Sequence, residues 1–216
     1  MQLVEVGSLT RELGASAMLA IENELDWEHL PHIHASTFSA ISLIRSDRNG
    51  WEADVVLANG APIRMVVMLD EDRLGYSNGT FSGDVEVARA VARIEVVSSE
   101  TCRINMRFLA PPAPEAELAA AGSFFETLYK QILDEDEPKM QHHARALREG
   151  PAARLRRRSV TLSNGQTYQA PEVCPHQGLP LSSEPDAFGI MTCPWHGYRF
   201  DVRTGKCIHG KCKGWD

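Results

Sequence analysis

The chain has 216 residues, more than one average domain and fewer than two, and its 43% hydrophobic and 24% charged residues are typical of a globular protein rather than a disordered one. Acidic residues outnumber basic ones by 29 to 22, and the net charge of -7 disfavours nucleic acid and anionic membranes as partners. The N-terminus lacks a signal-peptide pattern, and no run of about eighteen apolar residues occurs. We therefore expect a cytoplasmic protein.

The first 150 residues carry the pattern of a sheet followed by a long helix. A strand is predicted at residues 2–9, and a helix starts at residue 16, where apolar residues repeat at helical spacing. Further strands are predicted at 37–45, 51–58, 62–69, 73–77, 90–98 and 101–109, and a long helix from Glu115 to about Arg148. This order predicts an α+β domain in which one long helix covers an antiparallel sheet.

A basic segment divides this region from the rest of the chain. Gly150-Pro151 and the arginine-rich run at 154–158 predict a linker at 150–158, between domains at 1–149 and 159–216. The run is most simply a solvated connector, and the alternative is a docking site for an acidic redox partner. Beyond it, Asn164-Gly165 predicts a β-hairpin in a small all-β domain.

Two short loops of this second domain each offer one thiolate and one imidazole. Cys174 and His176 form the first pair, and Cys193 and His196 form the second. Two Cys and two His can hold a tetrahedral zinc ion, but zinc sites of that class usually group Cys with Cys and His with His. The mixed pairs in Cys-Pro-His and Cys-Pro-Trp-His-Gly resemble the Rieske family instead.

This resemblance covers residues 155–212 and extends to the flanking Gly197-Tyr198-Arg199-Phe200-Asp201. It implies a 2Fe-2S cluster in which Cys174 and Cys193 bind one iron and His176 and His196 bind the other. Imidazole ligands raise the reduction potential of such a cluster above that of an all-Cys cluster. Leu179 stands where some family members carry a further Cys, so we expect no disulfide between the two loops.

The remaining cysteines do not complete a second metal site in the same domain. Cys207, His209 and Cys212 lack a fourth ligand, and we interpret the two thiols as surface or packed groups.

A cluster of histidines and acids near the end of the first predicted helix indicates another metal site. Two His and one carboxylate suit a non-haem Fe(II) centre. His29 and His32 would share one face of a straight helix, whereas His29 and His34 converge only if the helix is broken, and Pro31 could break it.

The spacing of Asn23, Asp26, His29 and His34 resembles the mononuclear-iron motif of Rieske non-haem iron oxygenases. The resemblance implies that His29 and His34 bind Fe(II) and that Asp26 and Asn23 support catalysis, with Asp26 connecting to a cluster histidine of a neighbouring subunit. It also implies a third ligand on the long helix, for which Asp136 is the first choice and Asp134 and Glu137 are the fallbacks.

The family resemblance implies a helix-grip (START-like) catalytic domain and a terminal oxygenase that uses O2. Such an enzyme would hydroxylate or oxidatively demethylate an aromatic or other apolar ring, with electrons from a separate reductase or ferredoxin. Transfer between chains would imply a head-to-tail homotrimer. The domain order is the reverse of the usual one in the family. The alternative hypothesis is a Rieske-type electron carrier fused to a START-like ligand-binding module.

Overall fold

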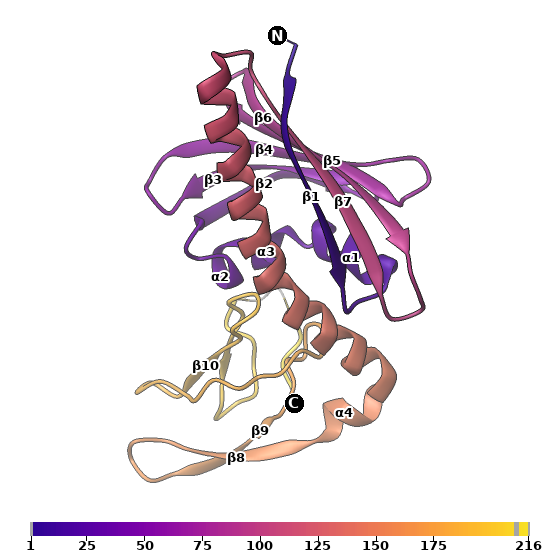
Figure 1. Cartoon of the computed structure of the whole chain (residues 1–216). Coiled ribbons are helices and arrows are strands. Elements are labelled where there is room, and N and C mark those ends of the chain that lie inside the picture. The colour runs from indigo at the N-terminus through magenta and orange to yellow at the C-terminus, as the bar shows by residue number, and fades with distance from the viewer. Residues whose placement is uncertain (1, 210–211, 216) are drawn as a thin grey trace. The chain divides into compact units, whose positions relative to one another are not determined.

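The computed structural model describes residues 2–209 and 212–215, which form two compact units (Figure 1). The first unit comprises Met1–Met140 and the second Gln141–Asp216, so the division falls inside the long helix. Among the described residues, no helix combines the length and apolar character needed to cross a membrane.

The first unit is built on an antiparallel sheet of seven strands. The strands are β1 (Val4–Leu13), β2 (Phe38–Asp47), β3 (Gly50–Leu57), β4 (Pro62–Leu69), β5 (Gly75–Ser82), β6 (Val85–Val96) and β7 (Cys102–Ala110). Their order in the sheet is β1-β7-β6-β5-β4-β3-β2, so strands adjacent in sequence pair as hairpins and β1 closes the far edge against β7. The predicted α+β class is confirmed.

Helix α3 (Glu115–Glu149) crosses this sheet (Figure 1) and packs on it through a stripe of buried residues. Gly122 and Leu133 of α3 are buried, and Phe108 of β7 stacks on Phe125 and Tyr129 of the helix. The helix backbone lies directly against β1 at Gly122, where an added Cβ would be 2.0 Å from the carbonyl oxygen of Val6. Only a residue without a side chain lets the helix backbone come this near to β1.

Two short helices and a 3-10 turn connect β1 to β2. Helix α1 (Ala17–Leu25) starts at Ser16, whose side chain accepts a hydrogen bond from the backbone N–H of Leu19. The chain then bends at Asp26, forms the 3-10 turn η1 (Trp27–His29) and continues as α2 (Leu30–Ile33). The predicted helix is therefore broken at Asp26 and not at Pro31, which lies in the first turn of α2, where proline is tolerated.

The second unit contains the end of α3 and two small sheets. The residues predicted as a linker contain α4 (Pro151–Leu155) and the start of β8 (Arg157–Thr161). β8 pairs with β9 (Thr167–Pro171) around the predicted hairpin turn, in which Gly165 has a φ of 83°. β10 (Ile190–Thr192) pairs with β11 (Arg199–Asp201).

Candidate metal centres

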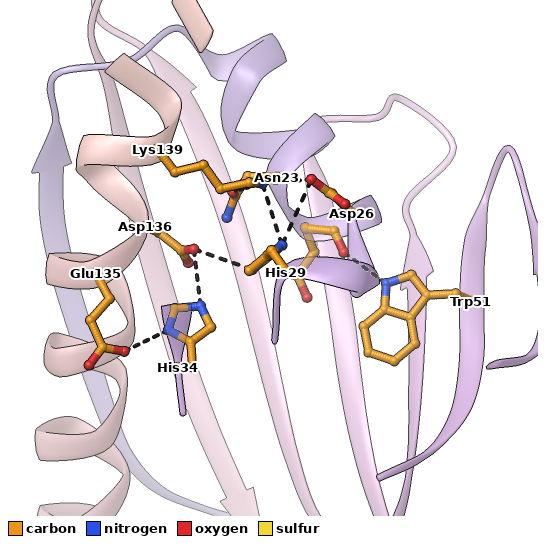
Figure 2. A network of polar contacts seen from close by, with 9 residues as sticks. Asn23, Asp26, His29, His34, Trp51, Glu135, Asp136 and Lys139 are labelled. Atoms are coloured by element: carbon orange, nitrogen blue, oxygen red, sulfur yellow. Dashed lines mark hydrogen bonds and ion pairs between the residues drawn. The ribbon is translucent and has the colours of Figure 1, made fainter. Parts of the chain in front are cut away.

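Three buried side chains of the first unit point toward one another (Figure 2). Asp136 Oδ1 of α3 lies 3.1 Å from His34 Nε2 and 3.4 Å from His29 Nε2. The three residues are at most 5% exposed, and each offers one ligand atom within 4.8 Å of the others. The structure thus brings together the two histidines and the first-choice carboxylate, although about a hundred residues of sequence separate them.

The local fold explains why these side chains meet. The turn at Asp26 separates His29 from the preceding helix, and His34 ends α2 with non-helical backbone angles. Their rings lie 5.2 Å apart at 69°. Two ligand atoms about 2.1 Å from one metal ion at right angles would be about 3 Å apart, which matches both distances to Asp136. The triad therefore fits a divalent metal ion.

Each histidine has a hydrogen-bonding neighbour at its second ring nitrogen. His34 Nδ1 is 2.6 Å from Glu135 Oε2, so a carboxylate can hold the imidazole with Nε2 directed toward Asp136. His29 Nδ1 lies 4.0 Å from Asp26 Oδ2 and 3.4 Å from Lys139 Nζ. These partners orient the rings toward the carboxylate.

Lys139 is a buried cation beside the triad. It is 4% exposed, and its ammonium group donates to Asn23 Oδ1 at 2.7 Å and pairs with Asp26 Oδ2 at 2.8 Å. The two residues expected to support catalysis, Asn23 and Asp26, are therefore joined through one lysine. No motif in the sequence singles out Lys139 or Glu135, although each lies on the helix within three residues of Asp136.

The charges of the triad respond to burial and to these contacts. Burial alone would raise the pKa of Asp136, but hydrogen bonds from His29 and His34 lower it below its usual range. Burial and the Lys139 charge lower the pKa of His29. For His34, burial acts to lower the pKa, but Asp136 and Glu135 together raise it. The carboxylate is thus ionised, as a metal ligand must be.

The alternative candidates lie elsewhere. Asp134 and Glu137 both pair with Arg11, and Glu137 Oε1 also accepts a hydrogen bond from the backbone of Gly14 at 2.7 Å. His32 is exposed, in contrast to the buried His29 and His34. The structure therefore does not bring the fallback acids or His32 into the triad.

A cavity of about 610 Å³ adjoins the triad. Its wall includes His29, His34 and Asp136 together with aromatic and aliphatic side chains from the sheet and from α3. Glu24 also lines it, and burial, reinforced by the negative charge of Asp136, raises the pKa of Glu24 to about 8. A cavity of this size and character is suited to an organic ligand beside the metal-binding groups.

In the second unit, the two predicted cluster loops have the same pattern of backbone hydrogen bonds. The N–H of Cys174 donates to the carbonyl of Leu179, and the N–H of Gly178 donates to the carbonyl of Cys174. Cys193, Gly197 and Tyr198 repeat this pattern in the second loop. Both glycines have positive φ, 80° and 65°, so the turn requires glycine at the fourth position after each cysteine.

The four side chains of these loops are compatible with a 2Fe-2S cluster. Cys174 and Cys193 are each 1% exposed and contact each other, and the rings of His176 and His196 are 4.8 Å apart. A hydrogen bond from Cys174, with a further one from His196, lowers the pKa of Cys193, while the same contact raises the pKa of Cys174. Each loop supplies one thiolate and one imidazole, so the two loops together supply the two Cys and two His ligands.

The other cysteines form no disulfide among the described residues. Cys207 and Cys212 are partly buried and pack against the hydrophobic core of the second unit. Leu179, at the position of the possible extra cysteine, is fully buried.

Comparison with known protein families identifies the C-terminal part. Residues 136–214 match the family model of the Rieske [2Fe-2S] domain. This part of the chain is a Rieske domain, which implies a 2Fe-2S cluster. None of the curated proteins matches the chain in sequence.

Comparison with solved structures identifies the fold of the N-terminal part. The Zhui aromatase/cyclase from Streptomyces sp. R1128 superposes with a TM-score of 0.51 at 12% identity, covering 68% of this chain and 98% of that one. A START superfamily protein from Mycobacterium smegmatis gives a TM-score of 0.48 at 16% identity, covering 64% and 97%. The predicted helix-grip fold is confirmed by the seven-stranded sheet with its long helix and by the superposition on the aromatase/cyclase, and at 12% identity this similarity extends to the fold alone.

Proposed function

We propose that the protein is a terminal oxygenase in which His29, His34 and Asp136 hold a mononuclear Fe(II) ion. The observation that supports this most directly is the buried triad at the wall of an organic-ligand cavity, in a chain that also carries a Rieske domain. Two histidines and one carboxylate are the ligand set of non-haem Fe(II) oxygenases, and they leave coordination positions open.

The two metal groups would supply the redox chemistry: the 2Fe-2S cluster would deliver single electrons, and Fe(II) would activate O2. The protein groups would orient the metal ligands and exclude water. Glu135 would hold the His34 ring by accepting a hydrogen bond from Nδ1. The apolar wall of the cavity would exclude water and hold a ring substrate, which would be hydroxylated or demethylated there.

Asp26 has a defined place in this proposal. Its carboxylate is paired with Lys139 and lies near His29 Nδ1, so it can fix the orientation of that imidazole. We assign to it the further role, implied by the family resemblance, of contacting a cluster histidine of a neighbouring chain. Asn23 would support it by accepting a hydrogen bond from the same lysine.

The proposal requires partners outside this chain. O2 and a ring compound are the substrates, and a reductase or ferredoxin supplies the electrons. We propose a cytoplasmic homotrimer in which electrons pass between chains. The basic residues at 154–158 offer one surface to which an acidic donor could bind.

The test is the ratio of iron to acid-labile sulfide in protein purified anaerobically and reconstituted with Fe(II). Three irons to two sulfides are expected in the wild type, and two to two in His29→Ala. The matched control is His32→Ala, which removes an exposed histidine three residues away and should retain all three irons.

A second candidate function has its own supporting observation. Asp136 accepts hydrogen bonds from both histidines, so the triad can satisfy itself as a polar network without a metal ion. In that case, the protein would be a Rieske-type electron carrier fused to a START-like ligand-binding module. A ratio of two irons to two sulfides that His29→Ala leaves unchanged would support this candidate and exclude the oxygenase.

A further inference from the structure

Helix α3 carries four consecutive acids at residues 134–137, and the outer two are held by β1. The Arg11 guanidinium group pairs through Nη1 with Asp134, and through Nη2 with Glu137 Oε2 at 2.9 Å. Glu137 Oε1 accepts a hydrogen bond from the backbone N–H of Gly14 at 2.7 Å. Both oxygens of the Glu137 carboxylate are therefore held, one by Arg11 and the other by the residue that follows β1.

These contacts lie on the side of α3 that does not carry the metal-binding carboxylate. Asp134 and Glu137 are three residues apart, so they lie about 60° apart around a helix that turns about 100° per residue. On the same scale Asp136, Glu135 and Lys139 each lie at least about 100° from both of these acids. One side of the helix is thus held by β1, and another side presents the groups of the triad and its network.

The backbone of α3 is weakened at the same turn. Pro138 lies inside the helix and has no N–H group, so the carbonyl of Asp134 lacks its usual helical donor. The proline ring also crowds that carbonyl and favours a kink. Helix geometry alone therefore does not fix the direction of Asp136, and contacts with the sheet contribute to it.

The strand that makes these contacts is itself held in the sheet. β1 pairs with β7 from Val4 to Leu13, and Arg11 lies opposite Ile104 in this ladder. The side chains of Arg11 and Glu137 are 24% and 22% exposed, whereas that of Asp134 is 64% exposed. Because exposed ion pairs contribute little, the partly buried pair with Glu137 is expected to dominate.

A metal site tolerates little movement of its ligands, which must be held within about 0.5 Å and 10–20° of their productive geometry. A rotation of α3 by about 20° would move the Cα of Asp136 by about 0.8 Å, because helical Cα atoms lie about 2.3 Å from the axis. The carboxylate lies further from the axis and would move more. Such a rotation would disrupt the distances of 3.1 and 3.4 Å from Asp136 Oδ1 to the two histidines.

We propose that Arg11 is a positioning residue of the triad, which holds Glu137 and Asp134 against β1 and so fixes the rotation of α3 at which Asp136 faces both histidines. The two acids considered as fallback ligands act through the ligand that lies between them. The effect of Arg11 on metal binding rests on the proposed Fe(II) site, whereas its effect on the position of Asp136 does not.

The first experiment measures the Fe(II) affinity of the triad by metal competition, in the full chain with its 2Fe-2S cluster. Arg11→Met is expected to weaken Fe(II) binding about tenfold, the lower end of the range for groups that orient a metal ligand directly. Because Arg11 acts mainly through Glu137, Glu137→Gln should have a similar effect, and the double variant should lose no more than either single variant. If Arg11→Met does not fold, Glu137→Gln alone makes the test.

Arg103→Met is the matched control. Arg103 lies on β7 and also pairs with two carboxylates, those of Glu12 and Glu95, neither of which lies next to a residue of the triad. This variant should keep the wild-type Fe(II) affinity. Urea unfolding of both arginine variants separates the two effects, since a merely structural role would lower stability without changing the Fe(II) affinity of the folded protein.

The second experiment needs no metal ion at the triad. Crystal structures of the two arginine variants, prepared without Fe(II), report the position of Asp136. In Arg11→Met, the distance from Asp136 Oδ1 to at least one histidine Nε2 should increase by more than about 0.5 Å. In Arg103→Met, the distances should remain close to 3.1 and 3.4 Å.

An Asp136 that stays in place in Arg11→Met would overturn the proposal. An unchanged Fe(II) affinity in that variant, an equal loss in Arg103→Met, or losses that multiply in the double variant would overturn it as well. If the wild type binds no Fe(II) at the triad and Asp136 still moves in Arg11→Met, the oxygenase would be contradicted and the positioning role would stand.

Discussion

The two candidate metal centres obtain their ligands in different ways. In the second unit, each loop holds a cysteine and a histidine that are two or three residues apart, and the same pair of backbone hydrogen bonds shapes both loops. In the first unit, His29 and His34 come from the segment after a broken helix, and Asp136 comes from α3 about a hundred residues later.

This difference determines what surrounds the ligands. The loop centre depends mainly on backbone turns and on two glycines with positive φ. The triad depends on a side-chain network in which Glu135, Lys139 and Asp26 hold its histidines. A local site tolerates changes elsewhere in the fold, whereas a long-range site is sensitive to the groups that position it.

The largest expected effect is complete loss of the cluster in Cys174→Ala. Because the loop ligands are separate from the triad, only the two cluster irons should be lost, and Fe(II) at the triad should remain. Visible absorption measures the loss of the cluster, and iron analysis measures how much iron remains. Cys102→Ala is the control, since this buried cysteine belongs to β7 of the other unit, and it should keep the cluster. A full cluster in Cys174→Ala would contradict the assignment.

Lys139→Met should have the next largest effect, on stability. It leaves the Asp26 carboxylate, whose side chain is 13% exposed, without its cation, which costs about 3–5 kcal/mol for a buried pair. Urea unfolding measures the loss. Lys130→Met on the same helix breaks an exposed pair with Glu126 and should cost less than about 1 kcal/mol. Equal losses in the two variants would show that the triad network does not depend on Lys139.

Glu135→Gln should weaken Fe(II) binding without removing a ligand. The carboxylate accepts from His34 Nδ1 at 2.6 Å, and loss of such an orienting partner typically costs roughly 10–100-fold in metal affinity. Metal-competition titration measures the change in Fe(II) affinity. The exposed Glu126→Gln on the same helix is the control. An unchanged affinity would mean that the ring is held by packing alone.

The last prediction concerns the pH dependence of stability, whose effect is the smallest when it is counted per pH unit. Because the folded-state pKa of Glu24 is raised from 4.5 to about 8, the folded protein holds an extra proton between these values. The contribution to the free energy of unfolding is therefore intact below pH 4.5 and is lost as the pH rises to 8, by up to about 1.4 kcal/mol per pH unit.

Glu24→Gln should abolish this slope. Urea unfolding of both proteins at several pH values gives the difference, which should change with pH inside the window and stay constant below it. A parallel pH dependence for the two proteins would show that Glu24 is ionised in the folded state. It would then also carry charge into the cavity.

Much of the fold could be predicted because hydrophobic periodicity and turn residues are local signals. The long helix and the strand at 62–69 lie within a residue of their predicted limits. The predicted strand at 73–77 extends instead to Ser82, since Asn78 and Gly79 have weak strand propensity and are held in the sheet by their neighbours. Pairing with the neighbouring strands therefore sets the end of β5, which strand propensity alone does not predict.

For the candidate sites, too, the sequence predicts only the residues that belong to a motif. The histidines and Asp136 could be proposed from a motif, but the contacts of Lys139 with Asn23 and Asp26 join residues more than a hundred positions apart. Asn78 and Glu24 carry no motif, and their pairing follows from the position of α1 against β5. Such partners become visible only when the fold places them together.

The glycine contact between α3 and β1 bears on how this protein can vary in sequence. From Gly122 to Asp136 is fourteen residues, which is close to four turns and about 21 Å along the helix. The two residues therefore lie on nearly the same side of α3. A methyl group at Gly122 would meet the backbone of Val6 and force the helix to rotate or lift. A position about 21 Å along the helix from the triad thereby constrains whether Asp136 faces the histidines.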